Sequence, residues 1–274
     1  MRLLFATDLH GRLASYRELF ARARELEVQA VLLGGDLCPH ASGRGLAPIE
    51  RQRRFLLEEL RPELAGLRSL APLYGLLGND DWAEVQSALE LLEAEDLFRP
   101  LHLRVHDLGA DLSVAGYSCI PVPPFRMSDW SRWDSPSWEP PRPPSAPLLS
   151  TPTGVREADL AELRARPTIE EDLRALAALS APARTVYVIH TPPADTALDR
   201  MHGGRAIGSP ALRRWIDLHQ PPLTLHGHVH ESPSVTGQIA QRFGATLSVN
   251  PGDSRSRLRS ALVDLTRGHA SIPS

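Results

Sequence analysis

The sequence of 274 residues predicts an α/β fold, and two observations support that prediction. Three short apolar runs, at residues 3–6, 30–33 and 73–77, are separated by stretches whose apolar residues recur at helical spacing. Each run leads into a turn that carries Gly, Asp or Asn. Strand, helix and strand in this order describe βαβ units, in which the strands pair in parallel.

The helices of the N-terminal half are predicted from their capping residues and apolar stripes. Ser15 is expected to cap the first helix, and Pro48 to open the second near its first turn. Asp81, with Glu84 three residues later, has the pattern of a capping box for a third helix. The stripes that these helices would bury are Tyr16, Leu19, Phe20, Ala23 and Leu26, then Phe55, Leu56, Leu57 and Leu60, and then Val85, Ala88, Leu89 and Leu92.

The second half continues with strands and helices in alternation. Thr168, with Glu171, predicts a capped helix, and Ser209 followed by Pro210 predicts another. A further polar helix is expected over residues 155–166. The expected strands are residues 101–107, 112–119, 185–189, 223–225, 246–249 and 262–265.

Residues 120–154 differ in composition from the rest of the chain. They contain ten of the 25 prolines, together with Trp130, Trp133 and Trp138. Proline disfavours regular structure, but tryptophan side chains are costly to leave in water. We therefore expect a single domain over residues 1–274, with this Pro/Trp-rich loop inserted and packed over it, and we expect residues 140–150 to be mobile.

Composition indicates which cellular compartment and which kinds of partner to expect. The net charge of −3 gives no broad basic field, so nucleic acid is possible as a partner but not favoured. Cys38 and Cys119 have no metal or disulfide spacing, which indicates reduced thiols. No apolar run has the length of a signal peptide core or a membrane span. The sequence thus predicts a cytoplasmic protein without membrane association.

Side chains of the types that bind metals follow five of the predicted strands. In an open α/β sheet, functional groups gather at the carboxyl ends of the strands, so these side chains can converge from distant parts of the chain. A mixture of His, Asp and Asn suits divalent ions of intermediate hardness better than Mg²⁺ or Ca²⁺ alone. The candidate ligands are Asp8, His10, Asp36, Asn79, His190, His228 and His230.

Together these blocks resemble the calcineurin-like metallophosphoesterase superfamily. Its signature blocks appear in order between residues 8 and 230, as Asp8-x-His10, Gly35-Asp36, Gly78-Asn79, His190 and Gly227-His228-Val229-His230. The residues within these blocks are most similar to those of the Icc-related phosphoesterases of bacteria and archaea. The resemblance implies a two-layer β-sandwich of mixed sheets flanked by helices, in place of a single parallel sheet.

The resemblance also implies two divalent metal ions, which could be Mn, Fe, Zn or Ni. The first ion would be held by Asp8, His10, Asp36 and His230. The second would be held by Asp36, Asn79, His190 and His228, with Asp36 bridging the two.

The implied activity is hydrolysis of a phosphoric ester by metal-activated hydroxide, and the implied partner is a small phosphorylated substrate. We expect that substrate to be a phosphodiester. One alternative is a phosphomonoesterase or protein phosphatase. Another is a metal-binding scaffold module without catalytic activity. The sequence does not predict the oligomeric state.

One position departs from the superfamily pattern. Where the superfamily often has a histidine after the Asn, this chain has Asp80. We assign Asp80 and Asp36 as catalytic residues, although an ionised carboxylate is a poor proton donor unless its pKa is raised. Arg205 and His202, in a Gly-rich loop, are candidates for substrate contact together with Asn79.

Overall fold

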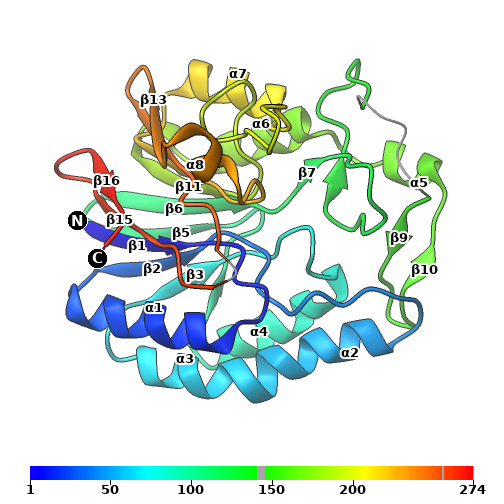
Figure 1. Ribbon diagram of the computed structural model, residues 1–274, viewed down its shortest axis with the longest axis horizontal. Helices are drawn as coiled ribbons and strands as arrows, with labels where there is room; N and C mark the ends of the chain where they lie inside the picture. The colour runs from blue at the N-terminus through cyan, green and yellow to red at the C-terminus, as the bar shows by residue number, and fades with distance from the viewer. Residues whose placement is uncertain (141–145, 255, 274) are drawn as a thin grey trace.

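Two six-stranded mixed sheets pack face to face in the computed structural model, which describes residues 1–140, 146–254 and 256–273 (Figure 1). This arrangement confirms the predicted two-layer fold. The first sheet has the order β16-β15-β1-β2-β3-β4, and the second has the order β13-β14-β12-β11-β6-β5. In the first sheet β1 to β4 pair in parallel, and β15 and β16 add antiparallel pairs on one side. In the second sheet the parallel strands β14, β12, β11 and β6 have an antiparallel strand on each side.

The strands of the first sheet are β1 Arg2–Ala6, β2 Ala30–Leu33, β3 Leu73–Gly75, β4 Arg99–Pro100, β15 Ala261–Asp264 and β16 His269–Ser271. The strands of the second sheet are β5 Val105–Gly109, β6 Leu112–Tyr117, β11 Thr185–Ile189, β12 Leu223–Leu225, β13 Ala240–Phe243 and β14 Thr246–Val249. Two short pairs lie outside the sheets, β7 Ile120–Pro121 with β8 Ser131–Arg132, and β9 Leu148–Leu149 with β10 Arg156–Glu157.

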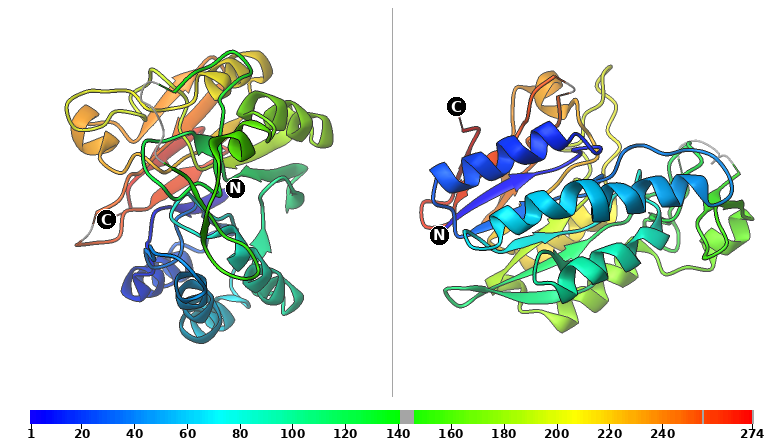
Figure 2. Two further views of the ribbon diagram at one scale, coloured as in Figure 1. Left: turned by 90° about the vertical axis from the view of Figure 1, so that its right-hand side faces the viewer. Right: turned by 90° about the horizontal axis from the view of Figure 1, so that it is seen from below.

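Helices cover the outer faces of both sheets (Figure 2). The helices beside the first sheet are α1 Leu13–Glu25, α2 Ala47–Arg54, α3 Arg61–Leu67 and α4 Gln86–Ala94, and a π-helical segment, Phe55–Leu60, joins α2 to α3. The remaining helices are α5 Leu160–Arg164, α6 Ile169–Leu179, α7 Pro210–His219 and α8 Ser232–Thr236, with short 3₁₀ turns at Ala83–Val85 and Pro182–Arg184.

The central strands are apolar at every position because both of their faces are buried. In β1, Leu3 and Phe5 point into the core between the sheets, whereas Leu4 and Ala6 point into the core beneath the helices. Successive side chains of a strand face opposite sides, so a strand covered on both sides has no polar alternation. This burial is why the apolar runs could be identified as strands from the sequence.

Several local predictions are confirmed and two capping predictions are wrong. Thr168 and Ser209 cap α6 and α7 as expected. Helix α1 begins at Leu13, so Ser15 lies within its first turn and does not cap it. Asp81 does not cap α4, because its carboxylate instead accepts hydrogen bonds from the backbone N–H groups of residues 37, 38 and 78.

Two other predicted elements differ from the structure. Residues 155–166 form β10 and the short α5 instead of one helix, because residues 156–157 pair with β9. The strand predicted at residues 101–107 begins only at Val105, since the chain leaves β4 through a turn.

The first half of the Pro/Trp-rich loop packs against the rest of the chain through its tryptophans. Trp130 and Trp133 are buried, and Trp138 is half-buried. The expectation of mobility for residues 140–150 is wrong for Leu148–Leu149, which form β9 and are buried, while residues 141–145 lie outside the described part of the chain. Among the helices that the described residues form, none has the length and apolarity needed to cross a membrane.

Candidate metal centre

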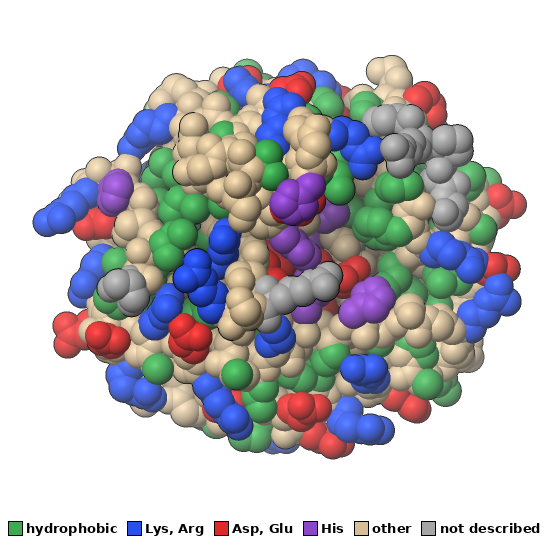
Figure 3. All heavy atoms as spheres, viewed as in Figure 1, with side chains coloured by type: hydrophobic (Ala, Val, Ile, Leu, Met, Phe, Trp, Pro, Cys, Tyr) green, Lys and Arg blue, Asp and Glu red, His purple; other side chains and the backbone are tan. Residues whose placement is uncertain are grey.

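The seven predicted ligands lie together at one edge of the two sheets. β1, β2 and β3 of the first sheet lead to Asp8, His10, Asp36 and Asn79, and β11 and β12 of the second lead to His190, His228 and His230. Figure 3 shows histidine side chains gathered around a hollow near the middle of one face, with acidic side chains at its floor. Each sheet therefore supplies part of the cluster.

The first predicted ligand set forms a compact group. Asp8, His10, Asp36 and His230 each offer one ligand atom, and these atoms all lie within 4.8 Å of one another. Nε2 of His230 is 3.0 Å from Oδ1 of Asp8 and 3.5 Å from Nε2 of His10. Asp8 and Asp36 are buried, whereas the two imidazoles are partly exposed. Carboxylates at the floor and imidazoles at the rim form a donor set that suits a divalent cation.

The second predicted set centres on the amide oxygen of Asn79. This Oδ1 atom is 3.0 Å from Nε2 of His190 and 2.7 Å from Nδ1 of His228. Oδ2 of Asp36 is 3.6 Å from Nε2 of His190, so Asp36 lies between the two sets. An amide oxygen, a carboxylate and two imidazoles converge here, and this donor set fits a second cation.

The contacts of the two ring nitrogens distinguish His190, whose Nε2 faces the cluster, from His226, whose two nitrogens are both used by the fold. Nδ1 of His190 donates to the carbonyl of Gly34 at 2.7 Å, which leaves Nε2 facing the cluster, as is usual for metal-binding histidines. His226 instead lies outside the cluster. Its Nδ1 is 3.0 Å from the carbonyl of Ile189, its Nε2 accepts from Oγ1 of Thr224 at 2.8 Å, and burial lowers its pKa to about 4.

Charge in the cluster is balanced by protons in the metal-free protein. Burial would raise the pKa of Asp8, but the imidazoles of His230, His190 and His10 hold it well below its usual range. Burial likewise opposes ionisation of Asp36, yet His190 lowers the pKa of that carboxyl. Conversely, burial lowers and the carboxylates raise the pKa values of His190 and His230, each to about 9. A cation binding here would replace these protons.

The backbone at the cluster is strained. Asp8, His10, Asp36 and His228 have φ values of 57°, 46°, 51° and 64°, in the left-handed region that non-glycine residues rarely adopt. Such residues cost of order 1–3 kcal/mol each, and they concentrate at functional sites. Four of the seven candidates share this conformation, which indicates that the fold is shaped to present them.

Asp80 lies at the rim of the cluster beside a histidine that the sequence analysis did not select. Burial, with the nearby Asp36, raises the pKa of Asp80. Oδ2 of Asp80 is 3.2 Å from Nδ1 of His40 and 3.7 Å from Nδ1 of His10. His40 follows Asp36 by four residues on the same loop, a position that could have marked it as a candidate.

The two predicted substrate contacts lie on an exposed loop. His202 and Arg205 are both exposed. The backbone N–H of His202 is 3.4 Å from Oε1 of Glu231, the residue after His230, and the guanidinium of Arg205 contacts Sδ of Met201 at 3.4 Å. The loop thus lies next to the cluster, while the contacts of these side chains within the described structure do not include the candidate ligands.

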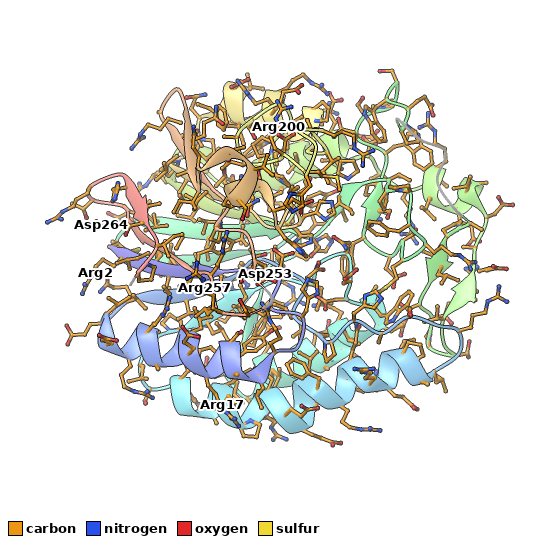
Figure 4. The ribbon with its side chains drawn as sticks, viewed as in Figure 1. Arg2, Arg17, Arg200, Asp253, Arg257 and Asp264 are labelled. Carbon is orange, nitrogen blue, oxygen red and sulfur yellow. The ribbon has the colours of Figure 1, made fainter. Side chains whose placement is uncertain are left out.

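A further charged pair, Arg12 and Asp253, links the segment after β14 to the loop that carries Asp8. Arg12 forms an ion pair with Asp253 and donates to the carbonyl of Ser254 at 2.6 Å, and it also approaches the carbonyl of Asp8 at 3.4 Å. Asp253 lies between β14 and β15, near the centre of the face seen in Figure 4. No local pattern marks this pair, because its members are 241 positions apart.

Comparison with known proteins gives a family and a fold. The family model described as calcineurin-like phosphoesterase matches residues 1–232. One crystal structure matches with a TM-score of 0.68 and 18% identity, covering 99% of this chain and 98% of that chain. A crystal structure from Thermus thermophilus matches with a TM-score of 0.63 and 19% identity, covering 99% of this chain and 97% of that chain.

A dimetal phosphatase from Danio rerio matches with a TM-score of 0.57 and 12% identity, covering 96% of this chain and 91% of that chain. At such identities the likeness concerns the fold. No curated protein matches this sequence.

Proposed function

This chain belongs to the calcineurin-like phosphoesterase family, a family of metal-dependent phosphoester hydrolases, and from that premise we propose that it hydrolyses a phosphodiester with two divalent metal ions. The observation that carries the proposal is the convergence of seven ligand-type side chains from five strand ends. Four of these side chains, from three of the strand ends, place their ligand atoms within 4.8 Å of one another. The narrower resemblance to Icc-related phosphoesterases stays a prediction.

The residues have distinct roles in this proposal. Asp8, His10, Asp36 and His230 would hold one metal ion, and Asp36, Asn79, His190 and His228 would hold the other. When bound, the two cations supply Lewis-acid charge that activates water and neutralises the phosphoryl oxygens.

The chain's own contribution is to fix these side chains in place. The carbonyl of Gly34 fixes His190, and the backbone N–H of Asp80 donates to Oδ1 of Asp36 at 2.7 Å. We further infer that His202 and Arg205 contact the substrate from the exposed loop, and that Mn, Fe, Zn or Ni is the metal.

A diester is preferred because of the charge at the rim. Asp80 stands next to Asn79, where the superfamily often has histidine, and it lies close to Asp36. A diester brings one negative charge to this rim and a monoester brings up to two, so repulsion by the carboxylates is weaker for the diester. Two buried, unpaired cysteines, Cys38 and Cys119, suit the reducing cytoplasmic compartment that we propose.

The proposal is tested by assaying bis-p-nitrophenyl phosphate and p-nitrophenyl phosphate with each of the four metals, at equal protein concentration. We expect turnover of the diester that a chelator abolishes and that Asp36→Asn removes. Turnover of the monoester alone would refute the diester preference. Activity that survives in Asp36→Asn would refute the bridging role. Absence of activity towards both esters with every added metal would favour the scaffold alternative.

A further inference from the structure

Hydrolysis of an ester with a basic leaving group needs a proton donor, and the superfamily histidine that often provides it is replaced here by Asp80. We propose that His40 donates the proton to the leaving oxygen, and that Asp80 orients His40. The inference rests on the proposed phosphoesterase function. In this arrangement a carboxylate, Asp80, occupies the position after Asn79 where the superfamily often has histidine. The imidazole comes instead from His40.

The position of Asp80 is fixed on several sides. Its backbone N–H donates to Asp36 at 2.7 Å, its carbonyl accepts from Nε2 of Gln52 at 2.7 Å, and its Oδ1 accepts from Nδ2 of Asn79 at 3.1 Å. This leaves Oδ2 facing His40, 3.2 Å from Nδ1. A carboxylate held in this way selects the tautomer in which Nδ1 carries the proton, so that Nε2 is the atom presented to a substrate.

The distances favour His40 over His10 as the partner of Asp80. The separation of 3.2 Å from His40 lies at the limit of hydrogen-bond distance, whereas 3.7 Å from His10 lies beyond it. His10 also has a second neighbour, Nε2 of His230 at 3.5 Å, within the first metal set. Oδ2 of Asp80 is therefore better placed to orient His40 than to contact His10.

His40 is accessible, as a residue that meets a leaving group must be. Its side chain is 56% exposed, against 23% for Asp80. Among the hydrogen bonds of the described residues, none involves Nε2 of His40. Both residues line an open cavity of about 640 Å³ beside the metal centre. The imidazole thus lies between the cluster and a space that could receive the departing group.

The rest of this cavity fits a ligand that carries a mainly apolar group and a negative charge. Phe125, Met127 and Leu148 form an apolar wall. Arg44 and Arg126 also line it, and both pair with the single carboxylate of Glu157, so one positive charge is left in excess. The charged groups that His40 faces are thus Asp80 on one side and this arginine pair on the cavity side.

The proposed step balances as a hydrolysis. An oxygen from water forms the new bond to phosphorus, and the bond between phosphorus and the leaving oxygen breaks. The leaving oxygen takes its proton from Nε2 of protonated His40, which is left neutral and regains a proton from solvent. No further reactant is needed.

The test compares two diesters that transfer the same methyl phosphoryl group, methyl p-nitrophenyl phosphate and methyl phenyl phosphate. The p-nitrophenolate ion leaves without protonation, whereas the more basic phenolate needs a proton. We expect His40→Gln to lower kcat/KM by about 100-fold or more on the phenyl ester and by less than about 3-fold on the p-nitrophenyl ester. The control is His269→Gln, which removes an exposed imidazole on β16 and should change neither value.

Equal loss on both esters, or no loss on either, would overturn the role of His40 while leaving the proposed function intact. Failure of the wild-type protein on both esters with all four metals would instead refute the proposed function and this inference with it. Asp80→Ala is expected to give a smaller loss that is likewise confined to the phenyl ester, with metal content unchanged by elemental analysis.

A readout independent of activity tests the pairing itself. ¹⁵N NMR of the metal-free protein should show the neutral His40 ring protonated at Nδ1, and Asp80→Ala should shift the proton towards Nε2. A ring already protonated at Nε2 in the wild type would contradict the orienting role of Asp80.

Discussion

Gly227 shows how closely the two sheets approach each other at the metal centre. A Cβ atom placed on this residue would lie 2.0 Å from Oγ1 of Thr7 and 2.5 Å from Oδ2 of Asp8. The next residue, His228, donates its backbone N–H to the same carboxylate at 3.2 Å. Asp8 is therefore oriented by a backbone from the opposite sheet, and that backbone has no room for a side chain.

Gly227→Ala is thus expected to destabilise the fold by about 1–3 kcal/mol through overpacking, and to reduce the bound metal because Asp8 must move. Denaturant unfolding and elemental analysis measure the two effects. The matched control is Gly66→Ala in α3, where an added Cβ meets no atom within 4 Å. The control should be neutral or more stable by about 0.5–1 kcal/mol. A Gly227→Ala protein with unchanged metal content would contradict this account of Asp8.

His102 makes stability depend on pH away from the metal centre. Burial, aided by Arg132, lowers the pKa of His102 to about 3. Its Nδ1 accepts from the backbone N–H of Ser118 at 3.0 Å, a bond that protonation would break. Below pH 6.5 the unfolded chain binds a proton at this residue and the folded chain does not. Stability therefore falls as the pH decreases from about 6.5 towards 3.

We expect the fall in unfolding free energy between pH 7 and pH 5 to be smaller in His102→Gln than in the wild type, by about 1–2 kcal/mol. Urea unfolding at the two pH values measures it. An equal fall in both proteins would show that His102 is protonated in the folded state.

At the scale of elements, helix α6 shows how capping can be read from sequence. Oγ1 of Thr168 accepts from the backbone N–H of Glu171 at 3.3 Å, and the Glu171 carboxylate accepts from the backbone N–H of Thr168 at 2.8 Å. Both bonds are local, and no other element competes for these side chains within the described part of the chain.

Thr168→Ala should lower the free energy of unfolding by about 1 kcal/mol, because the hydroxyl that accepts from the backbone N–H of Glu171 and donates to its carboxylate is lost. Thr168→Ser keeps the hydroxyl and should stay close to the wild type. Thermal or denaturant unfolding of both variants decides the matter, and equal destabilisation by Ser and Ala would point to lost methyl packing instead of a lost cap.

The contrast between Thr168 and Asp81 explains how far the sequence could predict the elements. Asp81 has the same spacing to a glutamate, but its carboxylate is used by three backbone N–H groups from two different loops. The candidate ligands were predictable because each follows an apolar strand directly. The pairing of His40 with Asp80 was not predictable, because Asp80 is 40 positions away on another loop. Local pattern thus locates strands and the residues at their ends, but not contacts between loops.

At the scale of the molecule, one apolar core joins the two sheets. Phe5 and Leu32 from the first sheet and Val188 and Leu225 from the second belong to the same buried cluster. We therefore propose that residues 1–274 form one domain. The parallel strands of both sheets end at the same edge, where the predicted ligands lie, so the metal centre depends on the packing of the whole fold.

Metal binding should accordingly raise the stability of the whole protein. Adding Mn²⁺ to chelator-treated protein at about one hundred times the dissociation constant is expected to stabilise it by about 2.7 kcal/mol. Differential scanning calorimetry measures this as a rise in Tm. Asp36→Asn is the control, and a Tm rise of the same size in that variant would place the binding elsewhere.

The division of the ligands between the sheets has a topological consequence. A cation held by Asp8 and His230 would join positions near both ends of the matched region and close a loop of more than two hundred residues. Such a metal crosslink restricts the unfolded chain as a long-range covalent crosslink does, and the conformational entropy lost on closing the loop grows with loop length. Removing the ion would open this loop without breaking a covalent bond, so proteolysis after chelation should begin where the edges of the two sheets meet.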